Sequence, residues 1–373
     1  MKRVLMAMVE VGNGHKAPAE SVKRAMEELF PGEFFLHVSD FARESGALVS
    51  DRALKKAWES AGRHYRAFRF LYRLVELLPA PGRWYARVAY ADFFEKGALF
   101  IRDFAPELVF STYTISSFVA AYARRLYGLD YKLVVFVADP FDAYSWWVEK
   151  DADAFIVAST EAADRLASHG VVKDRIFVLP YPVRKDFESA GNNRNAICRE
   201  FSLEPSNPIL LASGGGMGLG KVASYTEHLV RSNLPLNIIF LAGRNRELYS
   251  RMKALEKADS VCRLRVLEYT DRVVELTSSC DVVMGKAGAS TAMEAAVCCK
   301  PVIFTDWIAQ NDLAIIKHFT DNGYGWYFKK PAKLVEFFSG NYRRRLEEAS
   351  GRLRSAGYKS GVDDIARFLA DFL

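Results

Sequence analysis

Short apolar runs alternate with longer amphipathic stretches along the whole chain. The stretches between the runs repeat apolar residues at three- and four-residue steps, which is the helical period. Continuous apolar strands separated by helices are typical of a parallel, doubly wound α/β sheet, and the pattern occurs twice. The sequence therefore predicts two Rossmann-like sheets in tandem. The predicted strands lie at residues 3–11, 34–40, 107–112, 132–140, 154–159 and 175–180, and then at 208–216, 237–243, 263–269, 281–285 and 301–306.

The break between the two halves predicts the domain organisation. Residues 181–208, with the run GNNRN at 191–195, contain the expected linker. We expect an N-terminal domain over residues 1–185 and a C-terminal domain over 186–355. A last helix near residues 362–372, within the segment 356–373, is expected to pack back on the first domain.

One segment of the first half is both basic and aromatic. Residues 52–102 hold 11 basic and four acidic residues, a net charge of +7. Its apolar residues recur at helical spacing up to Pro79-Ala-Pro-Gly82 and resume after it, so a helical hairpin with a basic face suits an anionic bilayer surface. The alternatives are an amphipathic hairpin packed on its own core and, more weakly, a nucleic-acid surface, for which no motif is present. The residues expected to meet the membrane or the acceptor are Trp58, Arg66, Phe68, Arg69, Arg73, Trp84 and Trp146.

Composition limits the cellular setting. Half of the residues are hydrophobic, and the five cysteines form no CxxC pair, which argues against a disulfide framework and favours a reducing cytosol. No apolar stretch reaches the roughly 18 residues that a spanning helix needs, and the N-terminus lacks a signal-peptide pattern. We therefore expect any membrane contact to be peripheral, at the cytoplasmic face of the cell membrane.

Residues 284–312 carry the strongest chemical signal. A strand leads into a turn of small residues, a helix with Glu294, and a second strand that ends in polar residues. Such a turn lets backbone amides and a helix N-terminus approach a phosphate, while a carboxylate one helical turn later can accept ribose hydroxyls. An ordinary capped helix would leave the same pattern. The polar residues on which this interpretation depends are Lys286, Ser290, Thr291, Glu294, Gln310, Asn311 and Asp312.

Three further loops follow predicted strands. Gly12-Asn13-Gly14-His15 places a histidine where it can take a proton or orient a phosphate, or simply be solvated. The loop at 213–221 resembles a P-loop but has Val222 where a Mg-binding Ser or Thr is required, so it is expected to hold a diphosphate through backbone amides alone. Arg244, after the strand at 237–243, can neutralise a phosphate or cap a helix.

Asp151 and Asp153 form a DxD pattern of the kind that holds a metal in one class of sugar transferase. No third ligand is near them in the sequence, so a polar turn is the preferred interpretation. We predict no metal site and no bound cofactor.

Several motifs, in this order, resemble the monogalactosyldiacylglycerol synthase and bacterial diacylglycerol glucosyltransferase family, which has the GT-B fold and is related to the lipid II glycosyltransferase. They cover most of the chain. They are GNGHKAPA at 12–19, VADP at 137–140 with Trp146 or Trp147 downstream, VLPYPVRKDF at 178–187, the glycine loop at 213–220, AGRN at 242–245, and GKAGASTAMEA through DWIAQND at 285–312.

The resemblance implies two domains facing a central cleft and an inverting, metal-independent transfer of a hexose from UDP-glucose or UDP-galactose to a lipid hydroxyl, most simply that of diacylglycerol. It implies that Glu294 holds the ribose, that Tyr269 and Thr270 line the uracil site, and that Gln310 and Asn311 contact the hexose. His15 is the first choice for the catalytic base and Asp139 the alternative. The full donor-binding set that we predict is Gly14, Gly215, Gly216, Met217, Arg244, Tyr269, Thr270, Lys286, Gly288, Ser290, Thr291, Glu294, Gln310 and Asn311.

Two departures from the family pattern concern the acceptor side. Relatives often have a histidine shortly before the tryptophan that follows the Asp, where this chain has Ala143, Tyr144 and Ser145, and many have a His-Pro pair where it reads Ser111-Thr112-Tyr113. A transferase or epimerase that acts on a soluble or polyprenyl-linked acceptor, and a non-catalytic UDP-sugar-binding protein, therefore remain alternatives.

Overall fold

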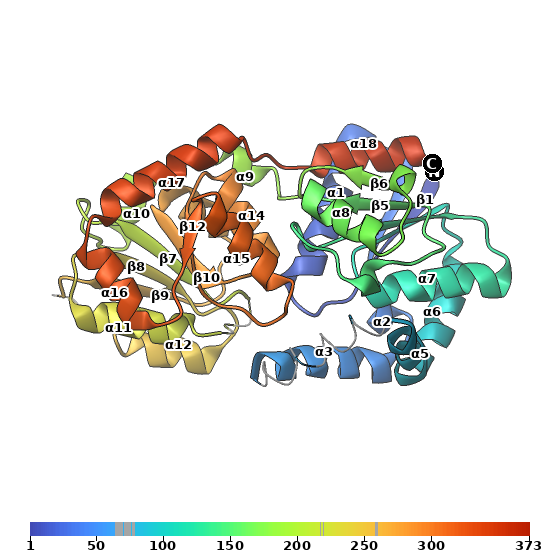
Figure 1. Cartoon of the computed structure of the whole chain (residues 1–373), viewed down its shortest axis with the longest axis horizontal. Helices are drawn as coiled ribbons and strands as arrows, with labels where there is room; N and C mark the ends of the chain where they lie inside the picture. Colours follow the sequence, from blue (N-terminus) through green and yellow to red (C-terminus); the bar gives the residue numbers. More distant parts are fainter. Residues whose placement is uncertain (64–69, 71–75, 77–78, 217, 219, 258–259) are drawn as a thin grey trace. The chain divides into compact units, whose positions relative to one another are not determined.

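The structure is a computed structural model, and it describes residues 1–63, 70, 76, 79–216, 218, 220–257 and 260–373. Its internal contacts divide the chain into two compact units (Figure 1). The first comprises Met1–Arg184, Ala309–Asn311 and Ser360–Leu373, and the second Lys185–Ile308 and Asp312–Lys359. Each unit contains a six-stranded parallel sheet with helices packed on it, so the predicted class of two parallel α/β sheets is confirmed.

The first sheet has the strand order β2-β1-β3-β4-β5-β6. Its inner strands are buried because βαβ crossovers place helices on both faces of a parallel sheet. The strands are β1 (Lys2–Met8), β2 (Phe34–Asp40), β3 (Leu108–Ser111), β4 (Lys132–Phe136), β5 (Ala154–Val157) and β6 (Ile176–Val178). The helices described here are α1 (Asn13–Leu29), α2 (Phe41–Glu44), α3 (Leu48–Arg63), α5 (Pro79–Ala89), α6 (Ala91–Phe104), α7 (Thr114–Tyr127), η1 (Ser145–Trp147), α8 (Thr160–Ser168), η2 (Lys173–Arg175) and α18 (Val362–Phe372).

The second sheet has the order β12-β11-β10-β7-β8-β9, and its core is an aliphatic and aromatic cluster around Phe240, Leu264 and Phe337. Its strands are β7 (Ile209–Ser213), β8 (Asn237–Leu241), β9 (Arg263–Leu267), β10 (Val282–Lys286), β11 (Val302–Asp306) and β12 (Gly325–Tyr327). Its described helices are α9 (Asp186–Ser189), α10 (Arg194–Glu200), α11 (Val222–Ser232), α12 (Arg246–Lys253), α13 (Val273–Ser279), α14 (Ala289–Val297), α15 (Asp312–Asp321), α16 (Pro331–Ser339) and α17 (Tyr342–Ala356).

Two of the differences from the sequence prediction have a clear local cause. The first strand ends at Met8 rather than at residue 11, because the chain turns where the Val11 amide donates to the Val9 carbonyl at 2.8 Å. The segment Pro79-Ala-Pro-Gly82, predicted as a break in the helical pattern, forms the first turn of α5. Amides in a first turn have no intrahelical acceptor, so proline costs no hydrogen bond there.

The last helix belongs to the first unit. In α18 the ring of Phe368 lies 4.6 Å from that of Phe177 in β6, between ring centroids. The chain enters α18 through Gly361, whose amide donates to the Tyr181 carbonyl at 3.0 Å. A Cβ placed on Gly361 would lie 1.7 Å from the Pro180 carbonyl oxygen, so only glycine fits at this approach.

We expect Gly361→Ala to lower the free energy of unfolding by about 1–3 kcal/mol, because the added methyl must push the two backbones apart. Gly351→Ala, in the middle of α17, is the matched control: its Cβ meets only a flexible arginine end at 3.9 Å, and it should raise stability by about 0.5–1 kcal/mol. Urea unfolding of both variants measures the difference. Equal stabilities would show that the close approach at Gly361 is relieved without cost.

Candidate active site

His15 lies in the first turn of α1, beyond the carboxyl end of β1. Gly12 precedes the helix with φ 128°, a conformation that favours glycine. The His15 Nδ1 lies 2.6 Å from the Thr112 carbonyl oxygen, and the Thr112 hydroxyl donates back to the His15 carbonyl at 2.8 Å. A carbonyl can only accept a hydrogen bond, so Nδ1 carries the proton and Nε2 keeps a lone pair.

Burial sets the charge of His15. Desolvation lowers the pKa of His15 to about 4, although its hydrogen bond to Thr112 acts in the opposite direction. Two aromatic rings contribute to this apolar surrounding: Tyr113, edge-on at 4.9 Å between centroids, and Trp147 at 6.3 Å. The imidazole is therefore neutral at physiological pH, in the form that can accept a proton.

Asp139 follows β4 and is buried. Its Oδ2 accepts a hydrogen bond from the Trp147 indole at 2.7 Å, and its Oδ1 accepts one from the side-chain amide of Asn311, in the loop 309–311 that the contacts group with the first unit. Burial, and secondarily the charge of Asp139, raise the pKa of the Tyr144 hydroxyl well above its ordinary value. The first unit thus brings both His15 and Asp139 next to Trp147, and both Asp139 oxygens accept hydrogen bonds.

Two glycine loops meet in the second unit. Gly215, after β7, has φ 73°, and its amide donates to the Ser213 hydroxyl at 3.1 Å. The Arg244 amide, after β8, donates to the Gly216 carbonyl at 2.9 Å. A Cβ on Gly243 would lie 2.5 Å from that same Gly216 oxygen, so the two loops approach this closely only because neither carries a side chain at the contact.

The helix α14 begins directly after β10. Gly288 is its N-cap residue, and the predicted phosphate residues Ser290 and Thr291 lie in its first turn. The Ser290 hydroxyl oxygen is buried and has no hydrogen-bond partner within the described part of the chain. A helix N-terminus with an unused hydroxyl is suited to a phosphate group. Glu294 lies one turn further, on the same helix face as Ser290 and Thr291.

Tyr269 and Thr270 follow β9, the edge strand next to β8. The Arg244 guanidinium lies 4.7 Å from the centroid of the Tyr269 ring, which is 52% exposed. The Thr270 hydroxyl accepts the Arg272 amide at 3.2 Å. Together with Lys286 at the end of β10, these residues place the predicted donor contacts of the second unit at the carboxyl edge of its sheet, where open α/β sheets bind ligands.

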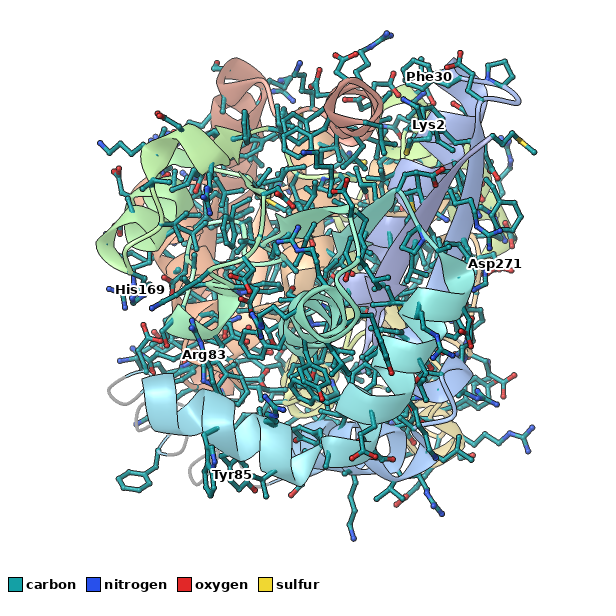
Figure 2. All side chains as sticks on the ribbon, turned by 90° about the vertical axis from the view of Figure 1, so that its right-hand side faces the viewer. Lys2, Phe30, Arg83, Tyr85, His169 and Asp271 are labelled. Carbon is teal, nitrogen blue, oxygen red and sulfur yellow. The ribbon has the colours of Figure 1, made fainter. Side chains whose placement is uncertain are left out.

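The described part of the basic hairpin exposes one aromatic face. On α5, Trp84, Tyr85 and Val88 are exposed by 69%, 62% and 57%. Arg83 lies on the other side of the helix, where it donates to the Ser145 carbonyl at 3.4 Å (Figure 2). Beneath α5 is a cavity of about 370 Å³ with an aromatic wall, over which Arg87 stacks on Tyr122 at 4.5 Å.

The other predicted membrane residues have different positions. Trp58, in α3, is half-buried, with its indole nitrogen 3.5 Å from where a Cβ on Gly12 would be, so it supports the His15 loop. Trp146 is half-buried against Phe118 at 6.2 Å between centroids. Of the three tryptophans in this predicted set, Trp84 is exposed and the other two are half-buried. Four residues of the set and one donor residue lie outside the described residues: Arg66, Phe68, Arg69, Arg73 and Met217.

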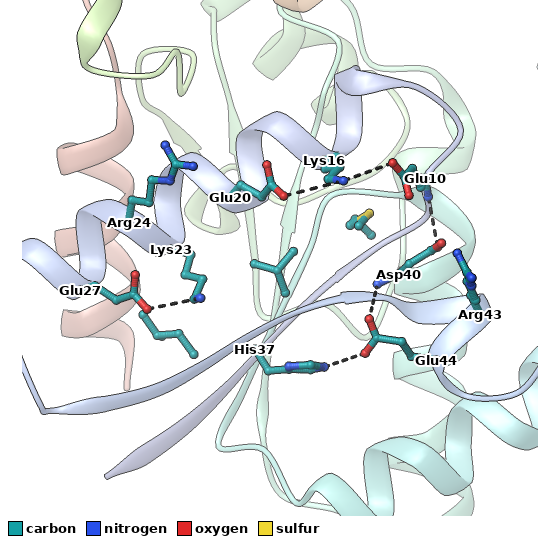
Figure 3. Close-up of a pocket in the computed structure, with 13 residues that line it drawn as sticks. Glu10, Lys16, Glu20, Lys23, Arg24, Glu27, His37, Asp40, Arg43 and Glu44 are labelled. Carbon is teal, nitrogen blue, oxygen red and sulfur yellow. Dashed lines mark hydrogen bonds and ion pairs between the residues drawn. The ribbon is translucent and has the colours of Figure 1, made fainter. Parts of the chain in front are cut away.

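A second cavity, of about 760 Å³, lies between α1, β2 and α2 (Figure 3). Its wall is charged but largely paired: Lys16 bonds Glu10 at 3.2 Å, and His37 bonds Glu44 at 2.7 Å. Because these charges compensate one another, the wall offers little unbalanced charge to a ligand. We assign it no part in the reaction.

The DxD pattern is built into the protein surface. Asp153 pairs with Arg124 at 2.6 Å, and Asp151 pairs with Arg125. Both arginines lie on α7, so the two carboxylates tie the turn before β5 to that helix.

Sequence reasoning missed three residues of the His15 site: Thr112, Tyr113 and Trp147. The sequence did show that Ser111-Thr112-Tyr113 replaces the family's His-Pro pair, and it left Trp146 and Trp147 open. What it could not show is that the residue after β3 supplies a carbonyl to the residue after β1. That contact depends on β1 and β3 being sheet neighbours.

Comparison with known proteins gives the family. Residues 15–183 match the monogalactosyldiacylglycerol (MGDG) synthase family model, and residues 221–333 match the glycosyltransferase family 28 C-terminal domain. The chain is 24% identical to the chloroplastic monogalactosyldiacylglycerol synthase of Spinacia oleracea, over 99% of this chain and 72% of that protein. It is 25% identical to monogalactosyldiacylglycerol synthase 3 of Arabidopsis thaliana, over 98% and 80%.

Solved structures agree on the fold. MurG of Acinetobacter baumannii matches with a TM-score of 0.65 at 16% identity, over the full length of both chains. Anabaena Alr3699/HepE in complex with UDP-glucose matches with 0.59 at 12%, again over both full lengths. In the described part of this chain, no helix combines the length and the apolar character needed to cross a bilayer.

The two parallel sheets, the glycine loops and these matches lead to one conclusion: the chain is a GT-B glycosyltransferase whose residues 15–183 match the monogalactosyldiacylglycerol synthase family and whose residues 221–333 match the glycosyltransferase family 28 C-terminal domain.

Proposed function

We propose that the protein transfers a hexose from UDP-glucose or UDP-galactose to the hydroxyl of a membrane lipid, diacylglycerol in the simplest case, with inversion at the anomeric carbon and without a metal ion. The observation that carries this proposal is the neutral, half-buried His15 with its Nδ1 proton held by Thr112. The names of the relatives, which describe synthases of a galactosyl diacylglycerol, support the acceptor class.

His15 is the proposed general base. Inversion needs a group that takes the proton of the acceptor hydroxyl as its oxygen attacks the anomeric carbon, and the Nε2 lone pair of His15 supplies one. Asp139 is less suited, because Trp147 and Asn311 already donate to its two oxygens. We assign Asp139 the role of fixing Trp147 and the loop at Asn311.

Donor binding is assigned to the second unit. We propose that the loops at Gly215, Gly216 and Arg244 and the first turn of α14 hold the diphosphate, and that Glu294 accepts the ribose hydroxyls. Backbone amides and a helix N-terminus stabilise the negative charge that develops on the leaving UDP. Tyr269 and Thr270 would line the uracil. Gln310, in the loop 309–311 that the contacts group with the first unit, is the exception and would contact the hexose.

We propose that α5 docks the enzyme on an anionic membrane surface as a peripheral protein. Trp84, Tyr85 and Val88 supply an exposed apolar face, and the basic residues of the segment 52–102 supply electrostatic attraction. The location at the cytoplasmic face of a cell membrane stays a prediction, since the relatives' names place those proteins in chloroplasts.

The central experiment measures UDP release from UDP-glucose and from UDP-galactose, with EDTA present throughout, on anionic vesicles with and without diacylglycerol. We expect release that depends on diacylglycerol and on one of the two donors. Release that is unaffected by any lipid would point to a soluble acceptor. Release that stops in EDTA and returns with a divalent cation would contradict metal independence.

His15→Ala should lower kcat by about 10²–10⁴-fold, because it removes the base, while the Kd for UDP changes little. His228→Ala, which changes an exposed histidine on α11, is the control and should keep full activity.

In the wild type, kcat/KM should stay flat as the pH falls from 7 to 5, because the pKa of His15 is lowered to about 4 and the imidazole stays neutral. An acid limb near pH 6.5 that disappears in an active His15 variant would contradict the half-buried, neutral base.

Glu294→Ala should weaken UDP binding about 10- to 100-fold, since hydrogen bonds to a charged group contribute about 1.5–3 kcal/mol. Glu294→Gln keeps one acceptor and should lose less. Calorimetric titration with UDP measures both, and thermal unfolding checks that each variant is folded. Wild-type affinity in Glu294→Ala would remove this residue from the ribose site.

A further inference from the structure

The positive charge of the second unit is concentrated on its last two helices. Residues 329–359 hold nine Lys and Arg and three Glu, a formal charge of +6, which equals the net charge of the whole chain. The rest of the chain therefore has no net charge. The basic residues of this stretch are all exposed; they are Lys329, Lys330, Lys333, Arg343, Arg344, Arg345, Arg352, Arg354 and Lys359.

Only part of this charge is neutralised locally. Glu336 pairs with Lys333 at 2.8 Å, and Glu348 pairs with Arg344 at 3.3 Å. Arg345 instead stacks over the Phe337 ring at 4.5 Å, so it contributes to packing as well as to charge. Both ion pairs join residues three or four apart on exposed helix faces, where each is worth only a few tenths of a kcal/mol and opens readily to another anion.

A pocket of about 380 Å³ borders α17 at the amino-terminal edge of the second sheet. Residues that precede β7, β10 and β11 form its floor, so it lies at the opposite edge from the glycine loops and α14. Arg194 in its wall is bound to Asp281 at 2.5 Å. Lys300, Arg343 and Arg354 also line the pocket, and Glu347 is the other carboxylate of the lining. Arg343 donates to the Ser206 carbonyl at 2.9 Å and Arg354 to the Ser350 hydroxyl at 2.8 Å, so both guanidinium groups contact neutral oxygens that do not compensate their charge.

We propose that the exposed face of α16 and α17, together with this pocket, binds the surface of an anionic phospholipid bilayer, and that the pocket receives one lipid phosphate. Guanidinium groups match phosphate oxygens in pairs, and a lysine adds a point charge. The helix α17, with 15 residues, is about 22 Å long, and by its period Arg343, Arg344 and Arg354 lie on one side of it, so these three can meet several head groups of a planar surface. The proposal goes beyond the transfer reaction, because none of these residues belongs to the donor or base sites.

Charge and shape favour a bilayer over a nucleic acid. Single-stranded nucleic acid binds where exposed aromatic rings can stack on its bases. On this face the rings of Phe337, Phe338 and Tyr342 are buried, and the half-buried Trp326 lies under Arg345, 5.5 Å from its guanidinium carbon. The face therefore offers charge without a stacking platform, which suits phosphates at the surface of a membrane.

The test is sedimentation of the full-length protein with vesicles of phosphatidylcholine mixed equally with phosphatidylglycerol, and with vesicles of phosphatidylcholine alone. The variant R343Q/R344Q/R354Q removes three charges from the face. The control R231Q/R251Q/K253Q removes three exposed charges from α11 and α12 of the same unit. A basic residue near an anionic surface contributes about fivefold to partitioning, so the variant should bind mixed vesicles between about tenfold and a hundredfold more weakly than wild type.

The control should stay within about twofold of wild type, and raising the salt concentration should remove the difference between the two proteins. A second comparison separates this surface from α5. The variant Trp84→Ser/Tyr85→Ser/Val88→Ser is measured with and without R343Q/R344Q/R354Q, and the three arginine changes should still weaken vesicle binding in this background. UDP binding of every variant confirms a folded second unit.

Wild-type binding of mixed vesicles by R343Q/R344Q/R354Q would overturn the proposal. An equal loss in the control would also overturn it, because the effect would then come from overall charge. The same variant is tested for binding of a DNA oligonucleotide, and a loss of DNA binding without a loss of vesicle binding would make this a nucleic-acid surface. Because the experiment measures vesicle binding and not turnover, a failure of the proposed transfer reaction would leave its result unchanged.

Discussion

The reciprocal pair of hydrogen bonds between His15 and Thr112 is the constraint on which the chemistry of the first unit depends. The Thr112 carbonyl fixes the tautomer, and the Thr112 hydroxyl holds the backbone of the first turn of α1. Both bonds join residues that follow neighbouring strands, β1 and β3, so the position of the imidazole is set by the register of the sheet. A surface histidine would lack this orientation and would share its proton with water.

In the second unit the constraint is the close approach of two glycine loops. Side chains would keep these loops apart, and the contact between Gly243 and Gly216 shows how little room is left. In the proposed function these loops hold a diphosphate, and the partial positive charge of their amides and of the α14 N-terminus takes the place of a lysine or a metal ion. This is consistent with Val222 standing where a P-loop has its metal-binding hydroxyl.

The sequence predicted the two sheets and most strands, because apolar runs of parallel strands are continuous and unambiguous. The structure has His15 and Asp139 after strands and Glu294 one turn into α14, as the sequence predicted, while their roles in binding and catalysis stay predictions. The sequence could not predict that Trp147, rather than Trp146, bonds Asp139, since the two neighbours differ only in the direction that η1 gives them. Nor could composition separate the exposed Trp84 from the half-buried Trp58, because both lie in basic helical segments of similar pattern.

The net charge of the chain does not show how its charges are distributed. A net charge of +6 is modest for 373 residues, and each half of the chain looks nearly balanced. Yet an excess of +7 lies in residues 52–102 and one of +6 in residues 329–359, offset by acidic residues elsewhere. Electrostatic attraction to a bilayer falls off within a Debye length of about 8–10 Å, so local excess matters more than the sum. A chain whose excess charge is gathered in two short segments can therefore be attracted to an anionic bilayer although its total charge is small.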